Sequence, residues 1–266
     1  MWSITSDVDK FRAAAGPGLL ARPVANTLLL TISGKVAAGG AAAVGGVSPV
    51  FGWHPDGSAF VWTPPRPLLL GGTAAPAAAT QLAALLDGVP GVNSTDEAAR
   101  AFVDAWCRRT GTTARPGVRS RLYRLGELVT PAVPGRARVA GAADRDLLIG
   151  WLTAFSVEID EPVGSPADSV DASLAYGGLT VWEVDGAPVA TAGVRQPAGG
   201  VVRVGPVYTP PEHRGHGYGA AVTAAVSAAA RPHEVVLFTD LDNPISNSIY
   251  QKIGYQSVED RQVYLF

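Results

Sequence analysis

Apolar residues recur along this chain at two different spacings. In residues 144–159, Leu148, Trp151, Leu152 and Phe155 share one face at helical spacing, which predicts an amphipathic helix. Residues 119–129 and 255–266 instead alternate between apolar and polar side chains, as a half-buried strand does. Runs rich in β-branched and aromatic residues predict further strands, at 26–33, 49–53, 58–63, 179–194, 201–209 and 235–240.

Turn and cap residues mark where these elements begin and end. Asp185-Gly186 divides 179–194 into a hairpin, and the segment HPDG separates the strands at 49–53 and 58–63. Glu97 is spaced as a capping-box partner of Ser94. Candidate N-caps precede three helices: Ser6 or Asp7, Ser94 or Thr95, and Ser165. Helices are predicted at 5–15, 74–87, 95–109, 165–177, 220–230 and 244–253, and a flexible Gly- and Ala-rich loop at 35–48.

The chain divides in its middle. Residues 130–141 contain two prolines and two glycines without hydrophobic periodicity, which places a domain boundary there. We therefore expect an α+β fold in two parts, a smaller N-terminal accessory domain over 1–130 and a second domain over 131–266.

The two halves also share a faint repeat. Trp62-Thr63-Pro64-Pro65 matches Tyr208-Thr209-Pro210-Pro211 at an offset of 146 residues, and the same shift superposes two pairs of predicted helices. Either the first half is a degenerate copy of the second, or two α+β domains share a Pro-ended strand by chance. In a copy, Leu68 would replace Arg214 and Thr73 would replace Gly219, so its glycine turn would have lost its function.

Composition narrows the class of protein. A hydrophobic fraction of 47% and a charged fraction of 17% are typical of a soluble globular chain. The net charge of −2 predicts no general attraction to nucleic acid or to an anionic membrane. No apolar run approaches the roughly 20 residues of a membrane span, and the N-terminus lacks a signal-peptide core. The single cysteine, Cys107, excludes an internal disulfide and fits a cytoplasmic location.

An unusual turn joins the strand at 201–209 to the Ala-rich helix that follows. Pro210 and Pro211 end the strand because neither can donate to a sheet ladder. Glycine permits positive φ and close approach of a ligand to the main chain, and three glycines follow at alternate positions: Gly215, Gly217 and Gly219. The free amides and positive dipole of the helix start, beside the charge of Arg214, predict a pyrophosphate-binding turn.

This turn fits two different motifs. Gly215-x-Gly217-x-x-Ala220, with Asp240 about 20 residues on, matches the dinucleotide fingerprint of NAD-binding oxidoreductases. Against that interpretation, the loop TPPEHR separates strand from glycines where a tight turn is needed. Only 26 residues follow Asp240, too few for the second half of a dinucleotide fold.

The other frame, Arg214-x-x-Gly217-x-Gly219, resembles the signature of the GNAT superfamily of acyl-CoA-dependent N-acyltransferases, [Q/R]-x-x-G-x-[G/A] after a strand. Residues 243–255, from Asn243 to Tyr255, resemble the second motif of that family, N-x-x-[AS]-x-x-[FL]-Y-x-[KR]-x-G-[FY]. The resemblance covers residues 136–266. It implies a mixed central sheet flanked by helices, with acetyl-CoA as the acyl donor.

The resemblance also implies roles for particular residues. Tyr250 matches the tyrosine that protonates the departing thiolate, and the Val207 amide is the candidate donor to the thioester carbonyl, worth about 3 kcal/mol in the transition state. Packing alone would also explain Tyr250, and helix capping would explain Asn243. The expected cofactor-binding residues are Val207, Tyr208, Arg214, Gly215, His216, Gly217, Tyr218, Gly219, Ala220, Asn243 and Asn247.

A general base is harder to identify. The signature strand contains no acid, so the candidate is Glu183 on the preceding hairpin, for which a surface role is the alternative. His213 and His216 are three residues apart but have no acid or cysteine cluster nearby, so we expect no metal site. Acids around the predicted helix pair could attract a cationic amine or simply be solvated: Glu158, Asp160, Glu161, Asp168 and Asp171.

Together these features predict an N-acetyltransferase that moves an acetyl group directly from acetyl-CoA to an amine of a small molecule or peptide. A non-catalytic acyl-CoA-binding or regulatory protein is the main alternative, favoured by the missing strand carboxylate and opposed by Tyr250. An NAD-binding oxidoreductase is a more remote one.

Overall fold

The computed structural model describes residues 1–159 and 164–266, and the same order of elements occurs twice in it, β-α-α-β-β-β-α-β-α-β. The first repeat contains β1 (Ser3–Thr5), α1 (Val8–Ala21), α2 (Thr27–Gly39), β2 (Val50–Trp53), β3 (Ala59–Trp62), β4 (Leu68–Leu70), α3 (Pro76–Ala83), β5 (Gly91–Thr95), α4 (Asp96–Thr110) and β6 (Arg115–Leu125). The second contains β7 (Arg136–Val139), α5 (Arg145–Glu158), α6 (Pro166–Leu174), β8 (Leu179–Val184), β9 (Ala187–Val194), β10 (Val201–Tyr208), α7 (Tyr218–Ala229), β11 (Glu234–Asp240), α8 (Pro244–Lys252) and β12 (Tyr255–Leu265). No helix in the described ranges is both long and apolar enough to cross a membrane.

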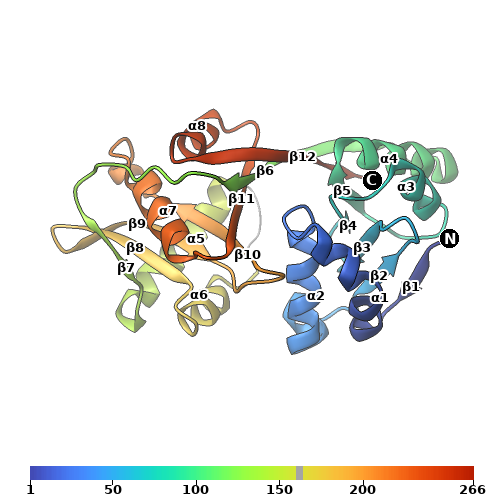
Figure 1. Ribbon diagram of the computed structural model, residues 1–266, viewed down its shortest axis with the longest axis horizontal. Coiled ribbons are helices and arrows are strands. Elements are labelled where there is room, and N and C mark those ends of the chain that lie inside the picture. Colours follow the sequence, from blue (N-terminus) through green and yellow to red (C-terminus); the bar gives the residue numbers. More distant parts are fainter. Residues whose placement is uncertain (160–163) are drawn as a thin grey trace.

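The strands of the described residues form one mixed sheet in the order β1-β2-β3-β4-β5-β12-β6-β11-β10-β9-β8-β7. Each repeat builds its own five strands, but the two last strands are exchanged. β12 pairs with β5 of the first repeat, and β6 pairs with β11 of the second. Between them β6 and β12 pair antiparallel, and Figure 1 shows β12 reaching from the second repeat to the C-terminus beside α3 and α4. The predicted α+β class with a mixed sheet is confirmed, and the sheet is continuous across both halves.

The repeat is real in topology, although the residues that suggested it are not equivalent. Trp62 ends β3, whereas Tyr208 ends β10, whose counterpart in the first repeat is β4. The offset of 146 residues therefore matched β10 with β3, the strand next to its true counterpart β4. The two helix pairs were matched correctly, α3 with α7 and α4 with α8.

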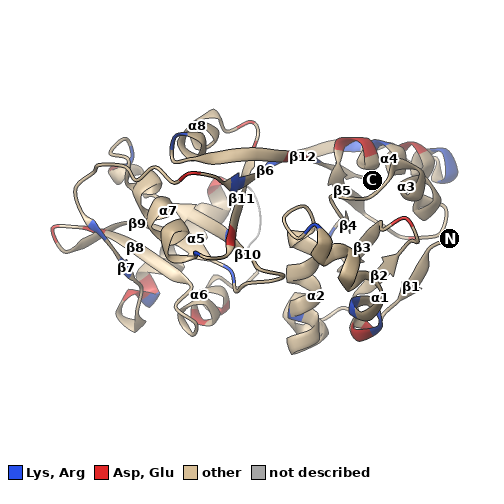
Figure 2. Cartoon of the chain, in the orientation of Figure 1, with Lys and Arg blue, Asp and Glu red and all other residues tan. Residues whose placement is uncertain are grey.

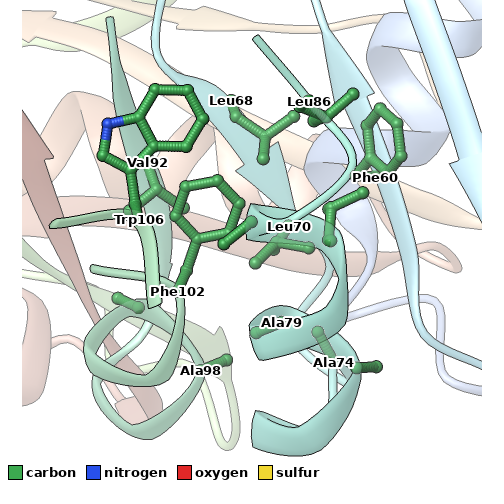
Figure 3. Close-up of a cluster of buried hydrophobic side chains, with 14 of the residues drawn as sticks. Phe60, Leu68, Leu70, Ala74, Ala79, Leu86, Val92, Ala98, Phe102 and Trp106 are labelled. Carbon is green, nitrogen blue, oxygen red and sulfur yellow. The ribbon is translucent and has the colours of Figure 1, made fainter. Parts of the chain in front are cut away.

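Each half of the sheet carries its own apolar core. In the first, Leu68 and Leu70 of β4 face Ala79 of α3 and Phe102 of α4 (Figure 3). In the second, α7 covers one face of the sheet with Val222 and Val226 at its centre. Helices α5 and α6 contribute a separate cluster that includes Leu148 and Val170. As predicted, Leu148, Trp151 and Leu152 lie on the packed face of α5.

One predicted strand is wrong. Residues 26–33 (NTLLLTIS) begin helix α2, which runs on through part of the segment predicted as a loop at 35–48. The hydroxyls of Thr31 and Ser33 donate to the carbonyls of Thr27 and Leu29 at 2.7 Å, four residues back. These local bonds let β-branched and polar residues be buried within a helix, so a pattern typical of a strand is overridden by packing.

The predicted caps have mixed outcomes. The side chains of Asp7 and Ser165 accept amide hydrogen bonds at the starts of α1 and α6, as expected. The capping box of Ser94 with Glu97 is absent among the described residues, because Ser94 lies inside β5 with its hydroxyl buried and unpaired. Helix α4 begins after Thr95 without a side-chain cap.

Candidate active site

Strands β10 and β11 diverge at the centre of the second repeat. They pair in parallel from Val201 opposite Glu234 to Val204 opposite Leu237, and the pairing ends there. On its other side, β10 shifts register against β9 between Val204 and Val207, which is a β-bulge. The end of β10 that carries Val207 and Tyr208 therefore has no partner on the β11 side, so its main chain is open to a ligand.

The glycine turn follows directly. Gly215 and Gly217 have φ of 82° and 81°, a region that favours glycine, and Gly217 is the N-cap of α7 without a side-chain cap. Within the described residues, the amides from Gly215 to Ala220 have no hydrogen-bond acceptor. A side chain at Gly219 would place its Cβ 3.1 Å from Thr209 Oγ1. Consecutive free amides at the positive end of a helix suit a phosphate or another anion.

Arg214 points to the other side of the turn, toward helix α5. Its Nη2 donates to both carboxylate oxygens of Glu158, the last residue of α5, at 2.7 Å each, and its Nε donates to the Thr209 carbonyl at 2.9 Å. The Tyr208 hydroxyl donates to the same Glu158 carboxylate at 3.3 Å. Arg214, Glu158 and Tyr208 therefore form a hydrogen-bonded group where β10, α5 and the glycine turn meet.

Tyr208 is held firmly at this place. Its ring lies 6.3 Å from the rings of both Trp151 and Phe155 of α5, and the Arg214 guanidinium lies 5.9 Å from its centre. Burial and the neighbouring Glu158 carboxylate raise the pKa of Tyr208. The hydroxyl therefore stays protonated at neutral pH and can act as a hydrogen-bond donor.

A cavity of about 390 Å³ lies beside the divergent strands. Tyr208, Gly205 and Pro206 line it at the bulge, and the other lining residues come from α5, α6 and strands β8 to β11. A volume of this size is in the range of small-molecule sites. A molecule bound in this cavity would therefore lie against the bulge of β10.

Helix α8 brings Tyr250 to the same core. Tyr250 packs with Val207, Tyr218 and Ala220 against one hydrophobic cluster, and its ring lies 6.1 Å from that of Tyr255. Its hydroxyl has no hydrogen-bond partner in the described part of the chain. Burial raises the pKa of Tyr250 to about 12, so the phenol remains protonated over the physiological range.

The two asparagines of α8 have internal partners. Asn243 is the N-cap, and its side chain accepts from the Ser246 amide at 3.0 Å. Asn247 donates to the carbonyls of Asp240 and Asn243 at 2.8 Å each and accepts from the Tyr123 hydroxyl at 2.9 Å. The Asn243 side chain therefore caps α8, whereas that of Asn247 ties α8 to the end of β11 and to β6.

Glu183 lies apart from this group. It is buried on β8, where Arg138 Nε donates to it at 2.6 Å, and Arg138 also binds Asp144 just before α5. Hydrogen bonds from Arg138 hold the pKa of Glu183 below its usual range. This carboxylate serves a structural ion pair at the N-terminal end of α5, whereas Tyr208 and Arg214 meet Glu158 at its C-terminal end. The placement does not support Glu183 as a base.

The histidines of the turn make local contacts. The His216 ring stacks on Tyr218 with centroids 5.3 Å apart, and its Nδ1 lies 3.3 Å from the His213 carbonyl. In the described ranges, no group of three or more His, Cys, Asp or Glu residues could hold a metal ion.

The corresponding turn of the first repeat is filled by the protein itself. Arg261 of β12 is buried between β4 and β5, where it donates to the carbonyls of Leu70 and Asn93. Its ion-pair partner Glu259 lies against Gly72, where an added Cβ would be 2.6 Å from a carboxylate oxygen. The first repeat thus has side chains where the second has an opening.

Sequence reasoning missed three residues that the structure brings to the site. Glu158 was noted only as one of several acids, and Asp160 and Glu161 from that set lie outside the described residues. Arg203 was seen only as part of a strand, although a charge inside a strand rich in valine is a signal that could have identified it. Tyr123 comes from the other half of the chain, and no local pattern indicates its contact with Asn247.

Comparisons with known proteins agree with this geometry. Residues 146–255 match the model of the acetyltransferase (GNAT) family, and no curated protein sequence matches the chain. A Drosophila protein of known X-ray structure is 12% identical, with a TM-score of 0.70 over 100% of this chain and 98% of its own. A GNAT-family acetyltransferase from Colwellia psychrerythraea is 13% identical, with a TM-score of 0.60 over 100% and 98%. A GCN5-related N-acetyltransferase from Kribbella flavida is 20% identical, with a TM-score of 0.55 over 78% and 86%.

At these identities the structures show a shared fold, which the two full-length matches extend to the first repeat. The second repeat of this chain carries a domain of the GNAT acetyltransferase family.

Proposed function

We propose that the protein is an N-acetyltransferase that moves an acetyl group from acetyl-CoA to an amine of a small molecule or peptide, with both substrates bound together. The observation that carries this proposal is the row of free amides from Gly215 to Ala220 beside two divergent strands. Free amides at a helix start fit a pyrophosphate, and an open strand edge fits the amide groups of a pantetheine arm.

Bound acetyl-CoA supplies an activated acetyl thioester. The chain supplies the groups around it. The Val207 amide, next to the bulge, donates to the thioester carbonyl, an interaction typically worth about 3 kcal/mol in the transition state. The cavity beside Tyr208 holds the acceptor amine against the bulge.

Tyr250 donates a hydrogen bond to the departing sulfur. With a pKa raised to about 12, its phenol is a weaker acid than a thiol with a pKa near 8.5, a difference of about 5 kcal/mol. The same dry surroundings raise the pKa of a thiol placed beside it, which narrows that difference. Tyr250 therefore stabilises the developing thiolate first and delivers the proton as the sulfur leaves.

Glu158 accepts the proton from the amine in place of Glu183. The Tyr208 hydroxyl lines the cavity and donates to Glu158, so it connects the acceptor amine with a carboxylate. Arg214 holds that carboxylate in position. The strand itself contributes no acid, in agreement with its sequence.

Two measurements test this function. Calorimetric titration with coenzyme A and with NAD identifies the nucleotide, and we expect binding of coenzyme A alone. Thiol release from acetyl-CoA in the presence of a panel of amines then measures turnover. We expect Tyr250→Phe to keep its affinity for coenzyme A while kcat falls about a hundredfold. Tyr264→Phe, at the end of β12 that pairs with β5, is the matched control and should behave as wild type.

Each other result has a definite meaning. Equal turnover of wild type and Tyr250→Phe would remove Tyr250 from the mechanism. Binding of coenzyme A without thiol release for any amine would favour a non-catalytic acyl-CoA-binding protein, and binding of NAD alone would favour an oxidoreductase.

A further inference from the structure

The cavity beside β10 contains a positive charge that no described residue neutralises. Arg203 lies on β10 and lines the cavity, and its Nη1 atom is buried with no hydrogen-bond partner in residues 1–159 and 164–266. Arg195, at the end of β9, lines the same cavity. Burial and the charge of Arg195 lower the pKa of Arg203 to about 10, so it still carries its charge at neutral pH. An unpaired buried guanidinium disfavours folding, and a bound anion would remove that cost.

The first repeat adds further positive charge to the same region. A second cavity of about 630 Å³ lies between α2 and α6, and Arg195 lines both cavities. Figure 2 shows α2 on the side of the first repeat that faces the second. Lys35, the basic residue of α2, lines this second cavity. Burial lowers the pKa of Lys35, and the charges of Arg195, Arg203 and Arg66 lower it further. Among the described residues that line this second cavity, Asp168 of α6 is the one acid.

The wall of the smaller cavity formed by α5 is apolar, with Leu148, Leu152 and Phe155, and Phe238 of β11 adds to it. Hydroxyl groups of α6, β9 and β10 line other parts, and Gly205 connects the cavity to the bulge of β10. A ligand that fills the cavity therefore meets cations at one side, hydrocarbon along its body, and the bulge where β10 opens.

We propose that the acceptor is a primary amine that also carries a carboxylate, with the carboxylate bound by Arg203 and Arg195 and an apolar body packed against α5. The planar fork of a guanidinium matches the two oxygens of a carboxylate. The position of the amine rests on the function proposed above, whereas the anion site rests on the cavity and its arginines alone. Lys35, which lines the neighbouring cavity between α2 and α6, attracts an anionic acceptor toward this site.

Binding to the full chain without an acyl donor tests the anion site directly. L-phenylalanine and L-leucine are each compared by calorimetry with the amine that lacks the carboxylate, 2-phenylethylamine and 3-methylbutylamine. We expect each amino acid to bind about tenfold to a hundredfold more tightly than the amine that lacks its carboxylate, as a charge-assisted hydrogen bond allows. Arg203→Met, which removes the charge and keeps the volume, should abolish that preference. Arg108→Met, at an exposed arginine of α4, should keep it.

The outcomes separate this proposal from the acyl transfer itself. If no carboxylate binds more tightly than its counterpart, or if the preference survives in Arg203→Met, the proposal is wrong. A preference seen only for O-phosphoethanolamine over ethanolamine would assign the site to phosphate and also overturn it. Circular dichroism checks the folding of Arg203→Met, and Arg195→Met, at a partly exposed position, gives an independent second variant. Because no acetyl donor is present, a failure of turnover does not affect the result.

Discussion

Single side chains decide what the two glycine turns of this molecule can bind. In the second repeat, Gly215 and Gly217 adopt positive φ and leave a row of amides free. In the first repeat, the carboxylate of Glu259 lies at Gly72, and Arg261 occupies the space between β4 and β5. The first turn thus carries its own anion, and the second is open to one from outside.

Gly217→Ala should damage the open turn. At φ of 81° a Cβ is strained, and it would lie 3.1 Å from Val133 Cγ1. We expect a loss of about 1–2 kcal/mol in the free energy of unfolding and a clear loss of coenzyme A affinity, measured by urea denaturation and calorimetry. Gly150→Ala, in the middle of α5 with no atom within 4 Å of the new Cβ, is the control and should be neutral or stabilising. Unchanged affinity in Gly217→Ala would contradict the role of the turn.

The raised pKa of Tyr250 makes a prediction about pH. A proton donor acts only while it is protonated, and a pKa of about 12 extends that state upward from the ordinary value near 10. We therefore expect that deprotonation of Tyr250 causes no loss of kcat between pH 7 and pH 10. A pH–rate profile measures this, with an acceptor whose amine is uncharged over that range. A fall in kcat with an apparent pKa below 10 that disappears in Tyr250→Phe would show that the phenol is not buried as described.

Arg203→Met should stabilise the empty protein. It removes a buried charge that has no described partner, and replacement of such a group by hydrocarbon is commonly favourable by about 1–2 kcal/mol. Urea denaturation at pH 7 measures the change, and Arg203→Lys, which keeps a charge in place, should show no such gain. A loss of stability in Arg203→Met would mean that the guanidinium contributes a stabilising contact in the folded state.

At the scale of elements, helix α8 is held in place from across the chain. Tyr123 of β6 is fully buried, donates to Asn247 and accepts from Gln251 at 3.2 Å. Since α8 also carries Tyr250, a strand of the first repeat positions a site residue of the second. This arrangement depends on the exchanged position of β6.

Tyr123→Phe tests this connection. It leaves the side-chain oxygen of Asn247 without its donor, so we expect a loss of about 1–2 kcal/mol in the free energy of unfolding. The hydroxyl of Tyr264 has no hydrogen-bond partner in the described residues, so Tyr264→Phe should change stability by less than about 0.5 kcal/mol. Equal effects of the two variants in urea denaturation would show that the bond to Asn247 contributes nothing.

Local patterns predicted most elements of the second repeat. Asp185-Gly186 marked the hairpin, Ser165 the start of α6, and the glycine turn the start of α7, because each signal acts within a few residues. Residues 26–33 were predicted as a strand because their burial comes from tertiary packing that composition does not show. The pairing of Glu158 with Arg214 and the contact of Tyr123 with Asn247 join residues 56 and 124 positions apart, beyond the reach of any local pattern.

At the scale of the whole molecule, one sheet runs through both repeats, with β12 and β6 at its centre. Each repeat completes its sheet with the last strand of the other. The two cores therefore share an uninterrupted set of main-chain hydrogen bonds, and we expect them to unfold together.

Calorimetry can measure this coupling. The wild type should show a single thermal transition. Leu70→Ala in the first repeat and Val222→Ala in the second should each lower the midpoint temperature of that same transition. The expected loss in the free energy of unfolding is about 2–5 kcal/mol for the leucine and less for the valine. Two separate transitions, each sensitive to only one of the variants, would show that the repeats are independent.

The crossing of β6 and β12 also limits how a gene of this architecture can be shortened. If the repeat with the filled turn were deleted, the remaining half would lose the strand that borders β11 and would expose a bare, aggregation-prone edge. Fragments made separately by cutting at 126–135 would each carry the strand that the other lacks. The repeat whose turn is filled therefore supplies the border strand without which the sheet of the other repeat would end at β11.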